Sequence, residues 1–319
     1  MRKDRRPKKN PPYLSIGVTI VGMALMLGAS GWRGASAPTT PSQNATRHTK
    51  MLNQPPKPMT IHRHGNQVTI QMYPEETEVT IAPGVQFPAW TFDGTVPGPV
   101  LYLHEGDHVT LTLHNLDPRV SHALDLHAAM VPPNQDFTAV LPGQSKTIRF
   151  VADTPGIFLY HCESSPMPLH MAQGMYGAVV VTPPGKEPPL YTVVQSEFYR
   201  PNHLSNVLNS QPQYVVFNGV ANRYVTNPLS VPVGTPFSVA VVNAGPNDFS
   251  AFHVVGSLLR DVQASGNVRN NLYDVQTYTL APGDAALIHL KFTKPGLYPF
   301  VSHAMDQFGK GAHGVFDAK

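Results

Sequence analysis

The feature that most constrains the fold is an internal repeat of Pro-Gly pairs. The pair at 142–143 is followed by one at 155–156, and the pair at 282–283 is followed by one at 295–296, thirteen positions apart in both halves of the chain. Proline followed by glycine marks a turn, and the residues between the pairs include many that favour strands. Each half therefore predicts a turn, a strand and a second turn in the same register.

A second repeat lies upstream of each pair of turns. Residues 106–115 read GDHVTLTLHN and residues 234–243 read GTPFSVAVVN, and both run nine positions from a glycine to an asparagine. Apolar and polar residues alternate in these segments, which is typical of a strand with one buried face. The two repeats together predict a duplicated β-sandwich with a junction near residues 183–189.

Composition favours the same fold class. The 319 residues include 33 prolines and 25 glycines spread along the chain, with many short runs of valine, threonine, phenylalanine and tyrosine. No segment keeps a 3.6-residue apolar period over three turns, so long helices are not expected. A chain of this length exceeds one comfortable core, and the sequence therefore predicts an all-β protein of two domains.

The first 37 residues have the form of an export signal. A basic stretch precedes an uncharged segment from Tyr13 to Ser30, and the small residues 34–37 offer a cleavage site. The uncharged segment is barely long enough to act instead as a membrane anchor. We expect residues 1–37 to be a signal peptide or an N-terminal anchor, and the body of the protein to work in the periplasm or elsewhere outside the cytoplasm.

The remaining chain divides where its composition changes. Residues 38–59 are rich in proline, serine and threonine and predict a linker. Residues 60–185 and 186–319 then form the two expected domains. Without the basic first 36 residues, the chain holds 16 basic and 19 acidic residues, a net charge of −3 against +3 for the whole sequence. This charge gives no support to nucleic-acid binding.

The single cysteine lies in a segment with the composition of a copper site. Cys162 is followed by His170 and Met175, so a thiolate, an imidazole and a thioether occur within thirteen positions. A second imidazole, from His122 or His127, would complete a Cys-His₂ site with a weak axial methionine, which is the ligand set of blue copper. Any one of these residues alone would be ordinary core filler, but the set together predicts an electron-transfer copper site.

Alternation along strands separates the remaining polar residues into two groups. Successive side chains on a strand point to opposite faces, so His161 and Cys162 should diverge. On a regular strand His122 and His127, five apart, diverge as well, while Asp125 shares the face of His127. We therefore expect His122 with Cys162 on one face. A partial metal site of two imidazoles and a carboxylate should lie on the other.

Four segments resemble the copper-containing nitrite reductases. They are HALDLHAAM, LYHCESSPMPLHMAQGMYG, AFHVVG and FVSHAMD, and a fifth segment, FDGTVPGPVLYLHEGD, is similar to a strand motif of the wider multicopper oxidase family. The resemblance covers roughly residues 65–319. It implies two tandem cupredoxin-like Greek-key sandwiches and dissimilatory reduction of nitrite to nitric oxide, with a type 2 copper receiving one electron from a type 1 copper.

The resemblance also assigns the site residues, with one copper of each type per chain. It implies a type 1 copper on His122, Cys162, His170 and Met175, a type 2 copper on His127, His161 and His303, a catalytic pair in Asp125 and His253, and a nitrite pocket shaped by Val255. It further implies a homotrimer in which His303 reaches the type 2 copper of a neighbouring subunit. The electron donor would be a cupredoxin or a c-type cytochrome.

Two other functions use parts of the same pattern. A two-domain laccase-like multicopper oxidase needs a His-Cys-His segment and several His-x-His pairs. Here position 163 is glutamate, and the only His-x-His, residues 62–64, is expected to precede the first clear strand. A non-catalytic electron carrier would need only the blue-copper site, and counting copper per chain separates it from a reductase.

Overall fold

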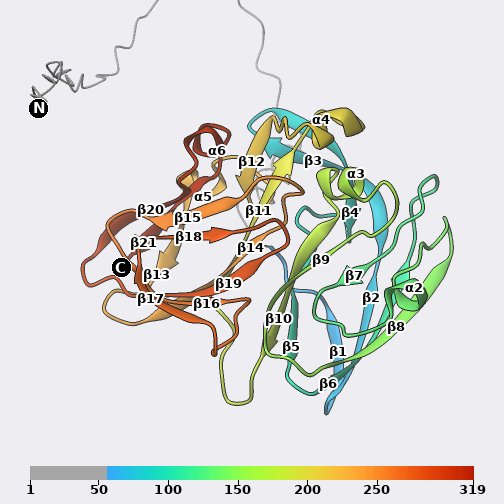
Figure 1. The fold of residues 1–319 in the computed structure, drawn as a ribbon, viewed down its shortest axis with the longest axis horizontal. Helices are drawn as coiled ribbons and strands as arrows, with labels where there is room; N and C mark the ends of the chain where they lie inside the picture. The colour runs from blue at the N-terminus through green and yellow to red at the C-terminus, as the bar shows by residue number, and fades with distance from the viewer. Residues whose placement is uncertain (1–55) are drawn as a thin grey trace, which may run out of the picture. The chain divides into compact units, whose positions relative to one another are not determined.

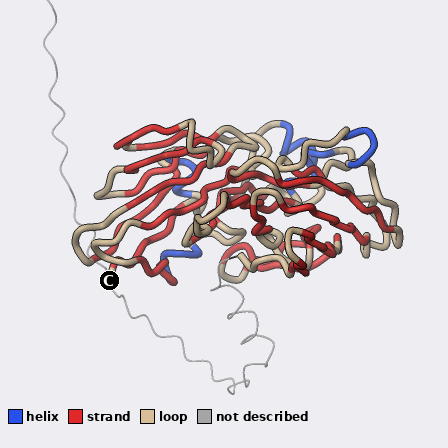
Figure 2. Tube along the Cα trace, turned by 90° about the horizontal axis from the view of Figure 1, so that it is seen from below, coloured by secondary structure: helices blue, strands red, loops and turns tan. Residues whose placement is uncertain are grey.

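The computed structural model describes residues 56–319, which belong to one compact unit (Figure 1). The predicted signal or anchor, residues 1–37, lies outside the described residues, as does all of the predicted linker except residues 56–59. Strands dominate the described chain, and its helices are short (Figure 2). None of the helices within residues 56–319 has the length and apolar character needed to cross a membrane.

The first half forms a sandwich of two four-stranded sheets. One sheet has the order β1-β2-β6-β8 and the other β5-β10-β9-β7. Neighbours in these sheets are often far apart in the chain, so connections cross between the sheets, as they do in Greek-key sandwiches. The strands are β1 (Ile61–His64), β2 (Gln67–Met72), β5 (Leu101–His104), β6 (Asp107–His114), β7 (Asp125–Leu126), β8 (Ser145–Ala152), β9 (Gly156–His161) and β10 (Tyr176–Thr182).

The second half forms a larger sandwich of the same kind. Its six-stranded sheet has the order β12-β11-β14-β19-β16-β17, and its five-stranded sheet has the order β13-β21-β20-β15-β18. The strands are β11 (Tyr191–Phe198), β12 (Tyr214–Phe217), β13 (Asn227–Val231), β14 (Phe237–Asn243), β15 (Ser250–Val254), β16 (Leu259–Ala264), β17 (Asn271–Val275), β18 (Thr277–Leu280), β19 (Ala285–Leu290), β20 (Gly296–Ser302) and β21 (His313–Ala318).

The sequence repeat corresponds to the same pair of strands in each sandwich. In the first, β6 pairs antiparallel with β8, and in the second, β14 pairs antiparallel with β19. Burial alternates along β6, as its sequence predicts. In β14 it is nearly continuous, because Val239 and Val241 pack in the core of the second sandwich while Ala240 and Val242 face the first. The all-β class and the two cupredoxin-like sandwiches are confirmed.

Two hydrophobic contacts join the sandwiches. In one, Val100, Leu159 and Val180 of the first sandwich pack against Val194 and Val242 of the second. The other uses a separate hairpin of β3 (Pro74–Ala82) and β4 (Val85–Phe92), which packs against the second sandwich around Phe198 and Val216. The hairpin therefore bridges both halves, and the far end of β4 carries Trp90 back into the first sandwich.

Short helices connect the strands near their ends. They are α2 (Pro133–Asp136), α3 (Met167–Ala172), α4 (Leu204–Leu208), α5 (Arg223–Thr226) and α6 (Met305–Gly309). Helix α3 matters most for the site, because it carries His170. One expectation was wrong: residues 62–64, the His-x-His segment, do not precede the first strand but lie within β1, since they pair with residues 67–69 of β2.

Candidate metal centres

Three buried side chains converge to form what we call the first cluster, His122, Cys162 and His170. The Cys162 sulfur lies 3.3 Å from Nδ1 of His170 and 3.8 Å from Nδ1 of His122. All the ligand atoms lie within 4.8 Å of one another. Met175 is fully buried in the same core as Cys162. A thiol, two imidazoles and a nearby thioether are the donors that a blue-copper site uses.

A short loop brings the later members of this cluster back to Cys162. Cys162 directly follows β9, and the chain turns through α3 before β10 begins at Tyr176. The backbone N–H of Cys162 donates to the carbonyl of Met175 over 3.1 Å. Gly174 has a φ of +115°, and a Cβ there would lie 2.7 Å from a methyl group of Val96. Only glycine fits this turn without strain, so the loop geometry is fixed by its sequence.

Asp117 fixes the orientation of His122, and sequence reasoning missed it. Nε2 of His122 donates to the Asp117 carboxylate over 3.1 Å, which leaves Nδ1 directed at the sulfur. Asp117 also accepts the backbone N–H groups of Arg119 and Val120. Burial raises the pKa of Asp117, but these hydrogen bonds together outweigh it and hold the pKa below its usual value. No local signal marks it, because the turn sequence NLD at residues 115–117 is equally typical of an exposed turn.

Burial keeps the first cluster uncharged in the metal-free protein. It raises the pKa of the Cys162 thiol to about 11, although the N–H of Ala123, which donates to the sulfur, partly opposes the rise. It lowers the pKa of His170 to about 4, helped by repulsion from His122, and it also lowers the pKa of His122. Neutral imidazoles can bind a cation directly. A bound metal replaces the proton of the Cys162 thiol, so the high thiol pKa does not prevent binding, and the residues present fit copper.

The second cluster consists of Asp125, His127 and His161. One Asp125 oxygen lies 3.9 Å from Nε2 of His127 and 3.7 Å from Nε2 of His161, and the two rings are 5.2 Å apart. Nδ1 of His161 donates to the carbonyl of Cys162 over 3.1 Å, so Nε2 is free to bind a metal. Burial lowers the pKa of His127, the charge of Asp125 opposes this, and His161 adds to it.

The grouping expected from alternation appears in the structure, but one of its premises was wrong. Strand β7 contains only Asp125 and Leu126, and His122 lies outside it in an isolated bridge to Val140. The segment from His122 to His127 is therefore not a regular strand. Its two imidazoles separate along a path that includes an isolated bridge at His122 and the two-residue strand β7, whereas His161 and Cys162 diverge at the end of a six-residue strand.

The second sandwich holds the other predicted site residues. His253 lies in β15 and His303 directly follows β20, with their rings 5.3 Å apart. Nδ1 of His253 donates to the carbonyl of Gln276 over 2.7 Å. Val255 follows β15 and is 45% exposed. In the described chain, His303 is exposed and is not a member of the second cluster, so a single chain does not bring together all three predicted type 2 ligands.

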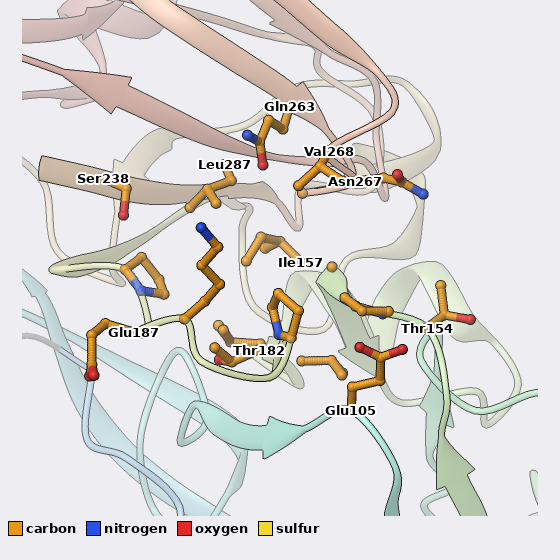
Figure 3. A pocket seen from close by; sticks show the side chains of 18 of the residues that line it. Glu105, Thr154, Ile157, Thr182, Glu187, Ser238, Gln263, Asn267, Val268 and Leu287 are labelled. Atoms are coloured by element: carbon orange, nitrogen blue, oxygen red, sulfur yellow. The ribbon is translucent and has the colours of Figure 1, made fainter.

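A separate cavity of about 520 Å³ lies between the two sandwiches (Figure 3). Figure 3 shows Gln263, Ser238 and Leu287 facing it from the second sandwich and Ile157 from the first. Lys186, Arg269 and His289 also line it, together with three acidic residues. None of the predicted copper ligands lines this cavity, so neither cluster belongs to it.

The chain is similar to proteins that bind copper. The family model described as multicopper oxidase matches residues 73–186. The chain is 34% identical to the copper-containing nitrite reductase of Neisseria meningitidis serogroup B, over 78% of this chain and 68% of that protein. It is 30% identical to the copper-containing nitrite reductase of Pseudomonas chlororaphis, over 90% of this chain and 86% of that protein.

Solved structures show the same relationship. The copper nitrite reductase of Nitrosomonas europaea matches with a TM-score of 0.77 and 36% identity, over 79% of this chain and 94% of that one. The copper-containing nitrite reductase of Thermus scotoductus matches with a TM-score of 0.74 and 32% identity, over 79% of this chain and 62% of that one. A multicopper oxidase structure at 23% identity shares the fold.

Proposed function

The chain belongs to the copper-containing nitrite reductases, a family of oxidoreductases, and we propose that it reduces nitrite to nitric oxide using a type 1 and a type 2 copper per chain. The observation that carries the proposal is the arrangement of His161 and Cys162. These neighbours belong to two different clusters of metal-binding side chains, and the ring of His161 also donates to the Cys162 carbonyl. A short covalent path and a hydrogen bond thus connect the two candidate centres.

His122, Cys162, His170 and Met175 would hold the type 1 copper. The Asp117 carboxylate and the N–H of Ala123 position His122 and the sulfur before any metal binds. When bound, the two coppers would supply the one-electron redox chemistry of the reaction. The core around the first cluster excludes water, because all three members are buried.

His127, His161 and His303 would hold the type 2 copper, with His303 supplied by a neighbouring subunit of a homotrimer. Two observations support this arrangement. Within residues 56–319 the second cluster contains two imidazoles, and His303 is exposed beside His253 in the other sandwich. Three imidazoles leave an open position for the substrate, as catalytic metal sites require.

Asp125 and His253 would supply the protons. Conversion of nitrite to nitric oxide and water consumes one electron and two protons. The Asp125 carboxyl group would bind and protonate a nitrite oxygen, and this role is supported by its distance of less than 4 Å from both imidazoles of the second cluster. His253 donates from Nδ1 to the Gln276 carbonyl, so Nε2 is left to deliver the second proton, and the exposed Val255 would border the nitrite pocket.

The donor and the location are part of the same proposal. A cupredoxin or a c-type cytochrome would deliver the electron to the first cluster. Residues 1–37 would direct the enzyme to the periplasm or another extracytoplasmic location, either cleaved as a signal or retained as an anchor.

Anaerobic assay of the copper-loaded protein tests this function. With nitrite and a small reductant, we expect nitric oxide release from a sample that contains two coppers per chain. Oxygen-dependent oxidation of a phenol without nitrite activity would instead favour the laccase-like alternative. One copper per chain with no gas release would indicate an electron carrier.

A further inference from the structure

The ring of Trp90 packs against both imidazoles of the first cluster. Its centroid is 4.7 Å from that of His170 and 5.8 Å from that of His122. The backbone supports this position, because the N–H of Trp90 donates to the carbonyl of Gln173 in the loop that carries His170. Trp90 is half-buried, whereas the two imidazoles are 0% and 1% exposed. The indole therefore lies between the imidazoles and solvent on this side of the sandwich.

The outer side of Trp90 lines a surface hollow of about 240 Å³. The side chains around it come from the β3–β4 hairpin and from three loops: Glu76, Thr77, Glu78, Pro88, Ala89, Arg119, Gln173 and Asn202. Glu76 pairs with Arg119, but Glu78 is exposed and has no ion pair within the described residues. Because Glu76 faces Trp90 and Glu78 faces Pro88 across the hairpin, both carboxylates lie on the side of the indole.

We propose that Trp90 is the contact through which an electron-donor protein reaches the first cluster, and that the donor presents a basic rim to Glu78. The inference rests on the proposed function. Electron tunnelling favours packed atoms over a solvent gap, and here the Trp90 side chain packs against both imidazoles and also lines the hollow. The indole is not itself oxidised: one electron would pass from the reduced donor, which is oxidised, to the metal held by the first cluster, which is reduced, and no bond is formed or broken.

Trp90 also shields the first cluster. An apolar ring over metal ligands limits solvent access and tunes the reduction potential of the bound metal. The exposed Glu78 carboxylate attracts a basic donor and raises its association rate, and this increase becomes smaller as salt is added. The role is therefore one of positioning and contact, separate from the catalytic residues of the second cluster.

The experiment compares a protein donor with a small one in the same full-length copper enzyme. A reduced, lysine-rich c-type cytochrome and ascorbate are each used to drive nitrite reduction in wild type, Trp90→Leu and Trp90→Phe. We expect the ratio of the cytochrome rate to the ascorbate rate to fall by about 10-fold or more in Trp90→Leu, and to be largely restored in Trp90→Phe, which keeps an aromatic ring. Tyr73→Leu removes a surface aromatic that contacts His114 and should leave the ratio unchanged.

A spectroscopic readout tests the geometry without turnover. The chain has two tryptophans, Trp32 and Trp90. Copper bound at the first cluster should quench the fluorescence of Trp90, so the quench seen in wild type should be lost in Trp90→Phe. The reduction potential of the type 1 site should also shift in Trp90→Leu and shift less in Trp90→Phe.

If Trp90→Leu does not retain copper, a charge variant tests the proposed donor contact instead. Glu78→Lys should lower the cytochrome rate by about 10-fold at low salt, with little difference at high salt. An unchanged cytochrome-to-ascorbate ratio in Trp90→Leu, or in Glu78→Lys at low salt, overturns the proposal. Absence of nitric oxide with ascorbate in the wild-type enzyme would instead overturn the proposed function, so the two failures are distinct.

Discussion

The imidazole of His161 donates a hydrogen bond to the carbonyl oxygen of Cys162, the residue that follows it, over 3.1 Å. The two side chains nevertheless belong to different clusters. The carbonyl is part of the backbone, so the hydrogen bond that sets the ring of His161 does not depend on the side chain at position 162. The two candidate centres are therefore linked in space but can be lost separately.

Replacing the thiol should remove one copper and leave the other. In Cys162→Ala the first cluster loses its only anionic ligand, while His161 keeps its hydrogen bond and its orientation. We expect the copper content to fall from two per chain to one, with loss of the intense thiolate-to-copper absorption and of donor-driven turnover. Metal analysis and the visible spectrum check this, and loss of both coppers would contradict the independence of the two sites.

Removing the proposed proton donor, Asp125, should slow turnover without affecting the first cluster. Asp125→Asn keeps the size of the side chain but cannot deliver a proton to nitrite. We expect nitrite reduction to fall by about 10²–10⁴-fold, the range typical of a positioned acid or base, with an unchanged type 1 spectrum. Exposed Asp153, on the same sandwich, provides the matched control Asp153→Asn, which should turn over normally. Wild-type turnover in Asp125→Asn would remove this residue from the mechanism.

Much of this fold could be predicted from the sequence, because the repeat consists of features that involve only residues close together in the chain. Pro-Gly turns and alternating segments mark β6, β8, β14 and β19, and the two halves form the same antiparallel pair, β6 with β8 and β14 with β19. The divergence of the His161 and Cys162 side chains could be predicted from the sequence in the same way, because neighbouring side chains on a strand point to opposite faces. Such features depend on few residues that are close in the chain.

What the sequence missed depends on contacts between distant segments. Trp90 lies 32 positions before His122 and 80 before His170, and it meets them only because the hairpin β3–β4 returns to the first sandwich. Asp117 was hidden by a different cause, since a buried aspartate in a turn has the sequence of an ordinary exposed one. The irregular path from His122 to His127 was also missed, because side-chain alternation assumes a strand that the chain does not form there.

Removing the Asp117 carboxylate should weaken metal binding at the first cluster. Asp117→Ala leaves Nε2 of buried His122 without its acceptor and frees the ring to rotate or change tautomer. Partners of this kind typically contribute about 10–100-fold to metal affinity, and we expect a loss of that size for the type 1 copper. Titration of the metal-free protein, followed by the thiolate absorption, measures it. Unchanged affinity would show that packing against Trp90 is sufficient to hold the imidazole.

Gly174→Ala should destabilise the loop that carries His170 and Met175. The φ of +115° is unfavourable for alanine, and the added Cβ would lie 2.7 Å from Val96 and 3.1 Å from the Trp90 carbonyl. We expect a loss of about 2–4 kcal/mol in unfolding free energy, the sum of backbone strain and steric clash. Gly185→Ala is the matched control, with a φ of +71° and no atom within 4 Å, and should lose only about 1 kcal/mol. Equal losses of unfolding free energy in the two variants would show that the backbone conformation alone causes the effect, without a contribution from the clash with Val96.

Asp93 should make stability depend on pH in a direction opposite to that of most carboxylates. Burial raises its pKa from 3.8 to about 6; the hydrogen bond from the Tyr73 N–H opposes the rise and the charge of Glu75 adds to it. The folded state therefore binds a proton more tightly than the unfolded state. The stability that this proton provides is complete below pH 4 and is lost as the pH rises through about 6.

Asp93→Asn isolates this contribution. Asparagine tolerates the φ of +55° at this position and can still accept the Tyr73 N–H, but it carries no charge. Relative to wild type, the variant should gain unfolding free energy between about pH 4 and pH 6, by about 1–2 kcal/mol because solvent screens this partly exposed carboxyl, and the gain should then level off. Urea unfolding of both proteins, each without metal, measures this difference, because titrations of groups remote from Asp93 contribute equally to both and cancel. A difference that stays flat across this pH range would show that the Asp93 carboxyl has the same pKa in the folded and unfolded chains.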